Sequence, residues 1–268
     1  MESIAARPEA EAVVEPERRV TYGELGELVL ASTRAMMGAG VGPGDRVAIW
    51  APNGLGWIVA ALGAQCAGAA LVPINTRFKG EEAAWLLSAS KAPLLVTTVG
   101  FLDTDTVGML SSAETPLPDL RRIVLLPGSQ PAKEASDAPE IEPWSVFLDR
   151  GDEVDPAAAT ARRESVRPTD PSDVLFTSGT TGRPKGVVMS HGQTVRLFRE
   201  WSDFAGLEPG DRYLIVNPFF HMFGYKAGWL ASLMRGATIF PVPVFDVPAV
   251  LSLVERERIT FLPGPPTL

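Results

Sequence analysis

The stretch of sequence that decides the fold runs Asp173-Val-Leu-Phe-Thr-Ser-Gly-Thr-Thr-Gly-Arg-Pro-Lys-Gly-Val-Val-Met-Ser190. Two apolar runs typical of β-strands, Val174–Phe176 and Val187–Met189, flank a segment of hydroxyls, glycines and one lysine. Pro184 biases the residue before it toward extended backbone, and the β-branched pair after Gly186 favours a strand over a helix. The stretch therefore predicts a strand, a loop and a second strand.

The loop of this predicted hairpin is dense in hydrogen-bond donors. Its glycines allow a ligand to approach the backbone closely, its hydroxyls add side-chain donors, and its lysine adds a mobile charge. Such a set suits a polyphosphate. A plain surface hairpin is the alternative, but a solvated loop has no need of so many donors. The spacing differs from the nucleotide loop G-x-x-x-x-G-K-[ST], so the phosphates would not rest on a helix N-terminus. The expected phosphate-binding residues are Thr177, Ser178, Gly179, Thr180, Thr181, Gly182, Lys185 and Gly186.

The segment Thr177-Ser-Gly-Thr-Thr-Gly-Arg-Pro-Lys-Gly186 resembles the phosphate-binding signature of the adenylate-forming enzymes, which include acyl-CoA synthetases and peptide-synthetase adenylation domains. Thr21-Tyr-Gly-Glu-Leu25 and Val72-Pro-Ile-Asn75 match recurrent early segments of that family. The resemblance implies ATP as a substrate, Mg²⁺ bound with it, and coenzyme A as acyl acceptor. By family analogy, Thr177 helps to position Mg²⁺ and Lys185 supplies catalytic charge to the phosphate oxygens.

Strand-like and helix-like segments alternate along the chain, which predicts an α/β fold of layered, mostly parallel sheets flanked by helices. By resemblance, residues 1–268 are expected to be part of the large amino-terminal AMP-binding domain, incomplete at its carboxyl end, with the small carboxyl-terminal domain absent. Pro127–Pro143, rich in proline, serine and acidic residues, is expected to be a surface loop, and Ile259–Leu262 a strand.

A second informative segment, Asn217-Pro-Phe-Phe-His-Met-Phe-Gly-Tyr225, follows the predicted strand Tyr213–Val216, and α/β proteins place ligand sites at strand ends. Taken alone, its aromatic cluster is more typical of a packed core. The resemblance reverses that interpretation, because the family places a Pro-x-x-His segment here, with the histidine beside the reacting acyl phosphate. His221 is then the second catalytic candidate. The expected acyl pocket, apolar enough for a hydrophobic acid, comprises Phe219, Phe220, Met222, Phe223, Gly224, Tyr225 and Gly264.

The composition of the chain indicates which kinds of partner and which cellular location to expect. The 268 residues carry a net charge of −8 with no Lys/Arg run, so we expect no nucleic-acid partner. The single cysteine, Cys66, cannot form an internal disulfide and favours a reduced, cytoplasmic protein. The uncharged stretch Trp57–Ile74 is broken by Gly68 and Pro73, so a buried helix and strand are expected instead of a transmembrane segment. The sequence leaves a homo-oligomer open.

Several family segments have no counterpart in the sequence: Tyr-Gly-x-Thr-Glu, Thr-Gly-Asp, and the small domain with its catalytic lysine. We therefore expect an incomplete portion, inactive alone, of an ATP-dependent carboxylic acid–CoA ligase that forms AMP. Asn217–Gly228 and Leu262–Thr267 are most similar to actinobacterial ligases of the steroid-degradation branch, which act on bulky alicyclic propanoates. A fatty-acid or aromatic-acid ligase is the alternative within this class. A non-catalytic, truncated nucleotide-binding or interaction protein is the alternative outside it.

Overall fold

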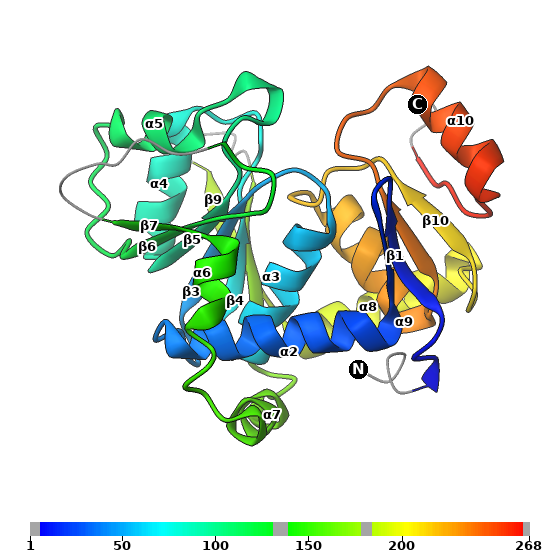
Figure 1. Ribbon diagram of the computed structural model, residues 1–268, viewed down its shortest axis with the longest axis horizontal. Coiled ribbons are helices and arrows are strands. Elements are labelled where there is room, and N and C mark those ends of the chain that lie inside the picture. The colour runs from blue at the N-terminus through cyan, green and yellow to red at the C-terminus, as the bar shows by residue number, and fades with distance from the viewer. Residues whose placement is uncertain (1–5, 131–138, 178–183, 265–268) are drawn as a thin grey trace. The chain divides into compact units, whose positions relative to one another are not determined.

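The computed structural model describes residues 6–130, 139–177 and 184–264. The chain divides into two compact units. Unit 1 comprises residues 1–28, 53–58 and 194–268, and unit 2 comprises residues 29–52 and 59–193. Each unit contains one sheet of mostly parallel strands accompanied by helices (Figure 1), so the predicted α/β class is confirmed.

Unit 2 holds the larger sheet, with seven strands in the order β7-β6-β5-β3-β4-β8-β9. Neighbouring strands are parallel except for the last pair, in which β9 is antiparallel to β8. The inner strands β3, β4 and β5 are buried, as parallel strands between helical layers require. The bounds are β3 (Arg46–Trp50), β4 (Ala70–Pro73), β5 (Leu94–Thr97), β6 (Arg122–Leu125), β7 (Glu140–Pro143), β8 (Pro171–Thr177) and β9 (Lys185–Ser190).

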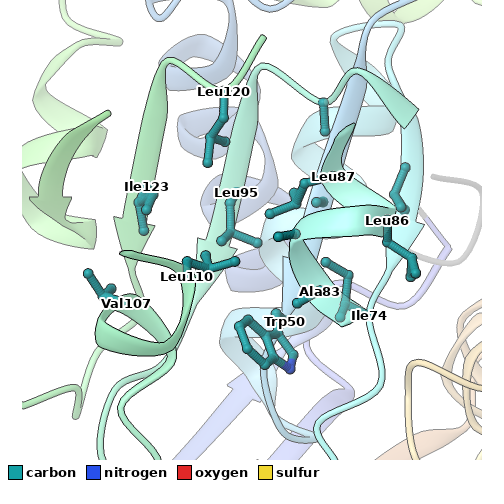
Figure 2. Close-up of a cluster of buried hydrophobic side chains, with 14 of the residues drawn as sticks. Trp50, Ile74, Ala83, Leu86, Leu87, Leu95, Val107, Leu110, Leu120 and Ile123 are labelled. Atoms are coloured by element: carbon teal, nitrogen blue, oxygen red, sulfur yellow. The ribbon is translucent and has the colours of Figure 1, made fainter. Parts of the chain in front are cut away.

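The core of unit 2 lies between this sheet and its helices. Leu87 and Leu110 belong to helices α4 and α5, and they gather with Leu95 of β5 and Ile123 of β6 (Figure 2). Each fully buried leucine or isoleucine contributes about 1.5–3 kcal/mol, so this cluster holds the helices on the sheet. The helices up to residue 205 are α2 (Tyr22–Gly38), α3 (Leu55–Cys66), α4 (Gly80–Ser90), η1 (Phe101–Asp103), α5 (Thr106–Ser111), α6 (Trp144–Asp149), α7 (Pro156–Ser165) and α8 (His191–Ala205).

Unit 1 holds a four-stranded sheet in the order β10-β11-β1-β2. Strands β10, β11 and β1 are parallel, and β1 and β2 form an antiparallel hairpin. Val250 of α10 packs on Val14, Leu214 and Phe240 of the sheet. The bounds are β1 (Glu11–Glu15), β2 (Arg18–Thr21), β10 (Arg212–Ile215), η2 (Phe223–Leu230), α9 (Ala231–Arg235), β11 (Thr238–Pro241) and α10 (Val247–Glu257).

Two sequence-based expectations about these sheets are wrong. Part of the expected loop Pro127–Pro143 is the edge strand β7, which pairs in parallel with β6. Its Glu142 carboxylate accepts hydrogen bonds from Arg122 Nη1 at 2.6 Å and Arg150 Nε at 2.9 Å, so distant arginines stabilise a strand of low intrinsic propensity. The expected strand Ile259–Leu262 is reduced to one parallel bridge between Phe261 and Tyr213.

The uncharged stretch Trp57–Ile74 forms most of helix α3 followed by strand β4, as predicted. Across the three described ranges, no helix has both the length and the apolar character needed to cross a membrane. Cys66, at the end of α3, is a half-buried free thiol. Burial raises its pKa, which keeps the thiol protonated and weakens it as a nucleophile.

An ion-pair network ties α10 to the sheet of unit 1. The carboxylate of Glu257 is 8% exposed and lies 2.7 Å from Arg19 Nη2 and 2.9 Å from Arg212 Nη2. Burial by itself would raise the pKa of Glu257. Hydrogen bonds from Arg19 and Arg256, with the charges of Arg19 and Arg212, outweigh burial and hold this pKa below its ordinary value.

Replacing Glu257 should therefore cost stability in a pH-dependent way. We expect Glu257→Gln to lower the free energy of unfolding at pH 7 by about 1–2 kcal/mol. A depressed folded-state pKa gives stability that is present above the unfolded pKa of about 4.3 and is lost as the pH falls through the folded pKa. The difference in the free energy of unfolding between wild type and variant should accordingly disappear below about pH 4. Denaturant unfolding at several pH values measures it, with exposed Glu255→Gln on the same helix as control. A difference in the free energy of unfolding that stays constant with pH contradicts the prediction.

Candidate active site

The predicted strand, loop and strand are present in unit 2 as the hairpin β8–β9. The described stem ends at the facing pair Thr177 and Lys185, and the next pair is Phe176 and Gly186. Thr177 and Lys185 are both exposed. The two residues that begin and end the donor-rich segment are therefore brought opposite each other. Five predicted phosphate-binding residues, Ser178, Gly179, Thr180, Thr181 and Gly182, lie outside the described residues.

Gly186 has a steric role in the hairpin stem. A Cβ atom at this position would lie 2.9 Å from Val174 Cγ1 and 3.3 Å from the Phe176 ring. The absent side chain lets the Phe176 ring pack across the hairpin and against Trp85 of α4, edge to face with centroids 5.6 Å apart. The hairpin stem is thus anchored to the body of unit 2 immediately below the donor-rich segment.

Helix α8 begins directly after β9 with a reciprocal cap. Gln193 N donates to Ser190 Oγ at 3.3 Å, and Ser190 N donates to Gln193 Oε1 at 3.0 Å. Ser190 is therefore the cap of helix α8. His191 follows it at the start of the helix, where its backbone N–H donates to Asp170 O at 3.0 Å.

The second predicted segment forms a tight loop in unit 1 between β10 and η2. His221 lies on it with an exposed side chain. The His221 N–H donates to Pro218 O at 3.0 Å, and the His221 carbonyl accepts from Tyr225 N at 2.9 Å. Its Nδ1 accepts from Phe223 N at 3.4 Å. In the neutral tautomer that accepts this bond at Nδ1, the ring proton is on Nε2, which is then a hydrogen-bond donor.

The expected acyl-pocket residues of this loop differ in exposure. Phe219 and Tyr225 are fully buried. Phe220 and Phe223 are half-buried, and Met222 is exposed. A fully buried ring has no surface to offer a ligand, so Phe219 and Tyr225 support the loop instead of lining a pocket. The other three side chains retain surface that an acyl group could contact.

An aromatic cluster beneath the loop explains why Phe219 and Tyr225 are buried. The Trp57 ring lies 5.7 Å from Phe219 and 5.8 Å from Tyr225, measured between centroids. Tyr225 stacks on Trp229 at 5.0 Å and 14°. Sequence reasoning missed Trp57 and Trp229 as supports, because their uncharged surroundings indicate burial but not which rings they meet.

Gly264 is the remaining acyl-pocket candidate. It is exposed and lines a cavity of about 290 Å³ whose walls include Val216, Phe245 and Leu262. None of the residues 219–225 is among those walls. Six of the predicted acyl residues therefore lie on the loop and the first residues of η2, and Gly264 lines a cavity to which they do not contribute.

Lys226 is a fully buried cation immediately after this loop. Its Nζ donates to Thr194 Oγ1 at 3.0 Å and lies 5.6 Å from the centroid of the Tyr225 ring. It belongs to η2, a π-helix of eight residues with a kink at Gly228 (φ −86°, ψ −107°), and π-helical turns are frequent at functional sites. A lone lysine in an uncharged run gives no signal of its partner.

Gly224 makes the turn after His221 sterically feasible. A Cβ atom there would collide with the carbonyl oxygens of Asn217 and Pro218, which are backbone atoms that can move only with the loop. We expect Gly224→Ala to lower the free energy of unfolding by about 1–3 kcal/mol, the usual cost of overpacking. Thermal or denaturant unfolding measures it. Gly42→Ala, whose nearest atom would be Arg162 Nη1 at 3.7 Å, is the control and should not destabilise the protein. Equal stability of wild type and Gly224→Ala contradicts the steric argument.

Comparison with known sequences identifies the family that this chain matches and the proteins that it resembles. The family model described as "AMP-binding enzyme" matches residues 1–268. The chain is 45% identical over 262 residues to "3-[(3aS,4S,7aS)-7a-methyl-1,5-dioxo-octahydro-1H-inden-4-yl]propanoyl:CoA ligase" from Rhodococcus jostii, covering 97% of this chain and 50% of that protein. It is 44% identical to the Mycobacterium tuberculosis protein of the same name, with 97% and 49% covered. The chain thus spans about half the length of these relatives.

Solved structures share the same architecture. The inhibitor-bound "N-terminal domain of FACL13" from Mycobacterium tuberculosis superposes with a TM-score of 0.83 at 25% identity, covering 99% of this chain and 61% of that one. The "anthranilate CoA ligase AuaEII in complex with anthranoyl-AMP" gives a TM-score of 0.82 at 24% identity, covering 97% and 48%, and shows the fold alone. Since the family model matches every residue, the chain belongs to the AMP-binding enzymes, which confirms the resemblance seen in the sequence.

Proposed function

We propose that this chain is the amino-terminal part of an acyl-CoA ligase that activates a hydrophobic carboxylic acid with ATP. The observation that carries the proposal is the β8–β9 hairpin, which brings Thr177 and Lys185 together in a chain 45% identical to a named CoA ligase. On this proposal residues 1–268 belong to one AMP-binding domain that is incomplete at its carboxyl end.

The chemistry overcomes the inertness of a carboxylate. Its negative charge repels nucleophiles and oxide is a poor leaving group. In the first half-reaction a carboxylate oxygen attacks the α-phosphorus of ATP, which forms an acyl-adenylate and releases pyrophosphate. In the second, the thiol of coenzyme A attacks the acyl carbon, which forms the thioester and releases AMP and a proton. Charge develops on phosphate oxygens in the first step and on the acyl oxygen in the second, so fixed donors supply most of the catalysis.

Two described groups are assigned to these steps. Lys185, exposed at the start of β9, supplies positive charge to the β- and γ-phosphate oxygens as pyrophosphate leaves, together with the donors of residues 178–182. His221 lies on its loop with an exposed side chain, and in the tautomer that accepts at Nδ1 its Nε2–H suits a hydrogen bond to an oxygen of the reacting carboxylate or acyl-adenylate. Phe220, Met222 and Phe223 would contact the acyl group.

Magnesium fits this chain as a companion of ATP. The described ranges contain no group of three or more His, Cys, Asp or Glu side chains that could hold a metal ion. Mg²⁺ usually keeps several waters and binds through substrate phosphates with one or two protein oxygens. The exposed Thr177 hydroxyl can provide one such oxygen. When bound, the ion would neutralise charge on the phosphates.

We further propose a bulky alicyclic propanoate as the acid, because two relatives at 44–45% identity are named as ligases of such a compound. Phe220, Met222 and Phe223 give the loop an apolar surface that suits this class and disfavours a charged acyl chain. A fatty or aromatic acid is the alternative, since other relatives at about 30% identity are named medium-chain acyl-CoA ligases. A cytoplasmic location and a homo-oligomer remain predictions.

Pyrophosphate release tests the proposal. The assay uses the polypeptide encoded by the whole reading frame that contains this chain, with ATP, Mg²⁺ and a panel of alicyclic, fatty and aromatic acids. We expect acid-dependent release, greatest with an alicyclic propanoate. Lys185→Ala should reduce the rate by about 10²–10³, as loss of one such donor does. Lys79→Ala removes an exposed lysine elsewhere in unit 2 and should leave the rate unchanged.

The outcomes separate the alternatives. No release with any acid, together with no binding of ATP, would favour the non-catalytic interpretation. Release that is greatest with a fatty or aromatic acid would keep the ligase and overturn the alicyclic substrate. An equal loss of rate in Lys185→Ala and Lys79→Ala would overturn the role of Lys185. The 268-residue chain assayed alone is expected to show no acid-dependent release, because the adenine- and ribose-binding segments of the family have no counterpart in it.

A further inference from the structure

The side chain of Asn53 is a buried amide at the junction of several segments of unit 1. It is 9% exposed and lies between the end of β3 and the start of α3. Its Nδ2 donates to Asn217 O at 2.9 Å and to Val242 O at 3.0 Å, with a longer contact to Ile215 O at 3.4 Å. Its Oδ1 accepts from Phe219 N at 2.7 Å. Both amide hydrogens are thus used within the protein.

These contacts are at the ends of two adjacent parallel strands. Ile215 ends β10, and Val242 directly follows β11. At strand ends the backbone groups leave the ladder and need other partners, because an unpaired buried carbonyl or N–H costs about 1–3 kcal/mol. The Asn53 side chain bonds to four such groups, one of which, Ile215 O, also accepts from Val242 N at 3.0 Å. A primary amide is suited to this, because it offers two donors and an acceptor within one small plane.

The same contacts fix the loop that carries His221. Asn53 binds this loop on both sides of Pro218, through Asn217 O and Phe219 N. Two residues beyond Phe219, the His221 N–H donates back to Pro218 O. The bonds of Asn53 therefore set the backbone from which the His221 imidazole projects. With no donor left for a ligand, the amide acts on the loop and not on a substrate.

We propose that Asn53 is the positioning residue for His221, holding the loop of residues 217–222 so that the imidazole keeps its Nδ1 contact. The catalytic part of this inference rests on the proposed ligase function. The structural part does not, so the two are tested separately.

The structural part can be read directly because the chain contains two histidines, His191 and His221. The imidazole C–H resonances of the 268-residue chain are recorded by NMR for wild type, Asn53→Asp and Asn53→Ala. His221→Gln identifies the His221 signal by its loss. Asn53→Asp keeps the shape of the side chain and the oxygen that accepts from Phe219 N, but it lacks the amide N–H donors of Nδ2. Asn75→Ala removes another strand-end asparagine, whose Oδ1 accepts from Arg77 N, and serves as the matched control.

We expect the His221 resonance to shift or split in both Asn53 variants, while the His191 resonance stays in place. Neither resonance should move in Asn75→Ala. If Asn53→Ala does not fold, His191 also changes, and the isosteric Asn53→Asp carries the comparison. An unmoved His221 resonance in a folded Asn53 variant overturns the proposal, even if the melting temperature falls, because that is the result of a purely structural role.

The catalytic part uses the same variants in the polypeptide of the whole reading frame. Misplacing a catalytic group by about 1 Å can lower a rate by about 10²-fold. We expect kcat for pyrophosphate release to fall about 10- to 100-fold in Asn53→Asp with the KM for ATP unchanged. A change in KM alone overturns the catalytic role. Inactivity of the wild type with every acid would instead contradict the proposed function. The NMR experiment would still decide whether Asn53 positions His221.

Discussion

Hydrogen bonding at the carboxyl ends of parallel strands is the constraint on which the candidate site depends. Inside the sheets the backbone pairs with its neighbours, but each strand must end, and its last groups need new partners. β8 ends at Thr177 and continues into the donor-rich segment, while β10 ends two residues before Asn217. Asn53 supplies partners at the end of β10. The loops that carry the candidate chemistry therefore begin where the ladders stop.

The sequence predicted those features that depend on local chemistry. The hairpin β8–β9 follows from β-branched runs around a glycine- and proline-containing segment, and its stem pairs as expected. Helices α2 and α8 also begin at residues whose side chains can cap a helix: Glu24 N donates to Thr21 Oγ1 at 3.2 Å, and Gln193 N donates to Ser190 Oγ at 3.3 Å. Lys185 was predicted both from the donor-rich segment that contains it and from the family motif, whereas His221 was predicted from the family motif alone.

Features that depend on distant partners could not be predicted. β7 forms because Arg122 and Arg150 reach Glu142, and nothing local to Glu142 indicates that. The burial of Phe219 depends on Trp57, and the role of Asn53 depends on backbone groups more than 160 positions away. The π-helical backbone of η2, with its kink at Gly228, is a further feature that the local sequence pattern does not indicate.

The burial of Lys226 has a consequence for chemical labelling. The chain has five lysines, and of those in the described ranges Lys79, Lys91 and Lys185 are exposed while Lys226 is fully buried. An amine reagent attacks the neutral amine, which must also be accessible. Lys226 should thus remain unmodified in the folded protein and react once unit 1 opens. Its rate of labelling would report local opening beside His221, while protection of Lys185 by a nucleotide would report occupancy of the hairpin in the same sample.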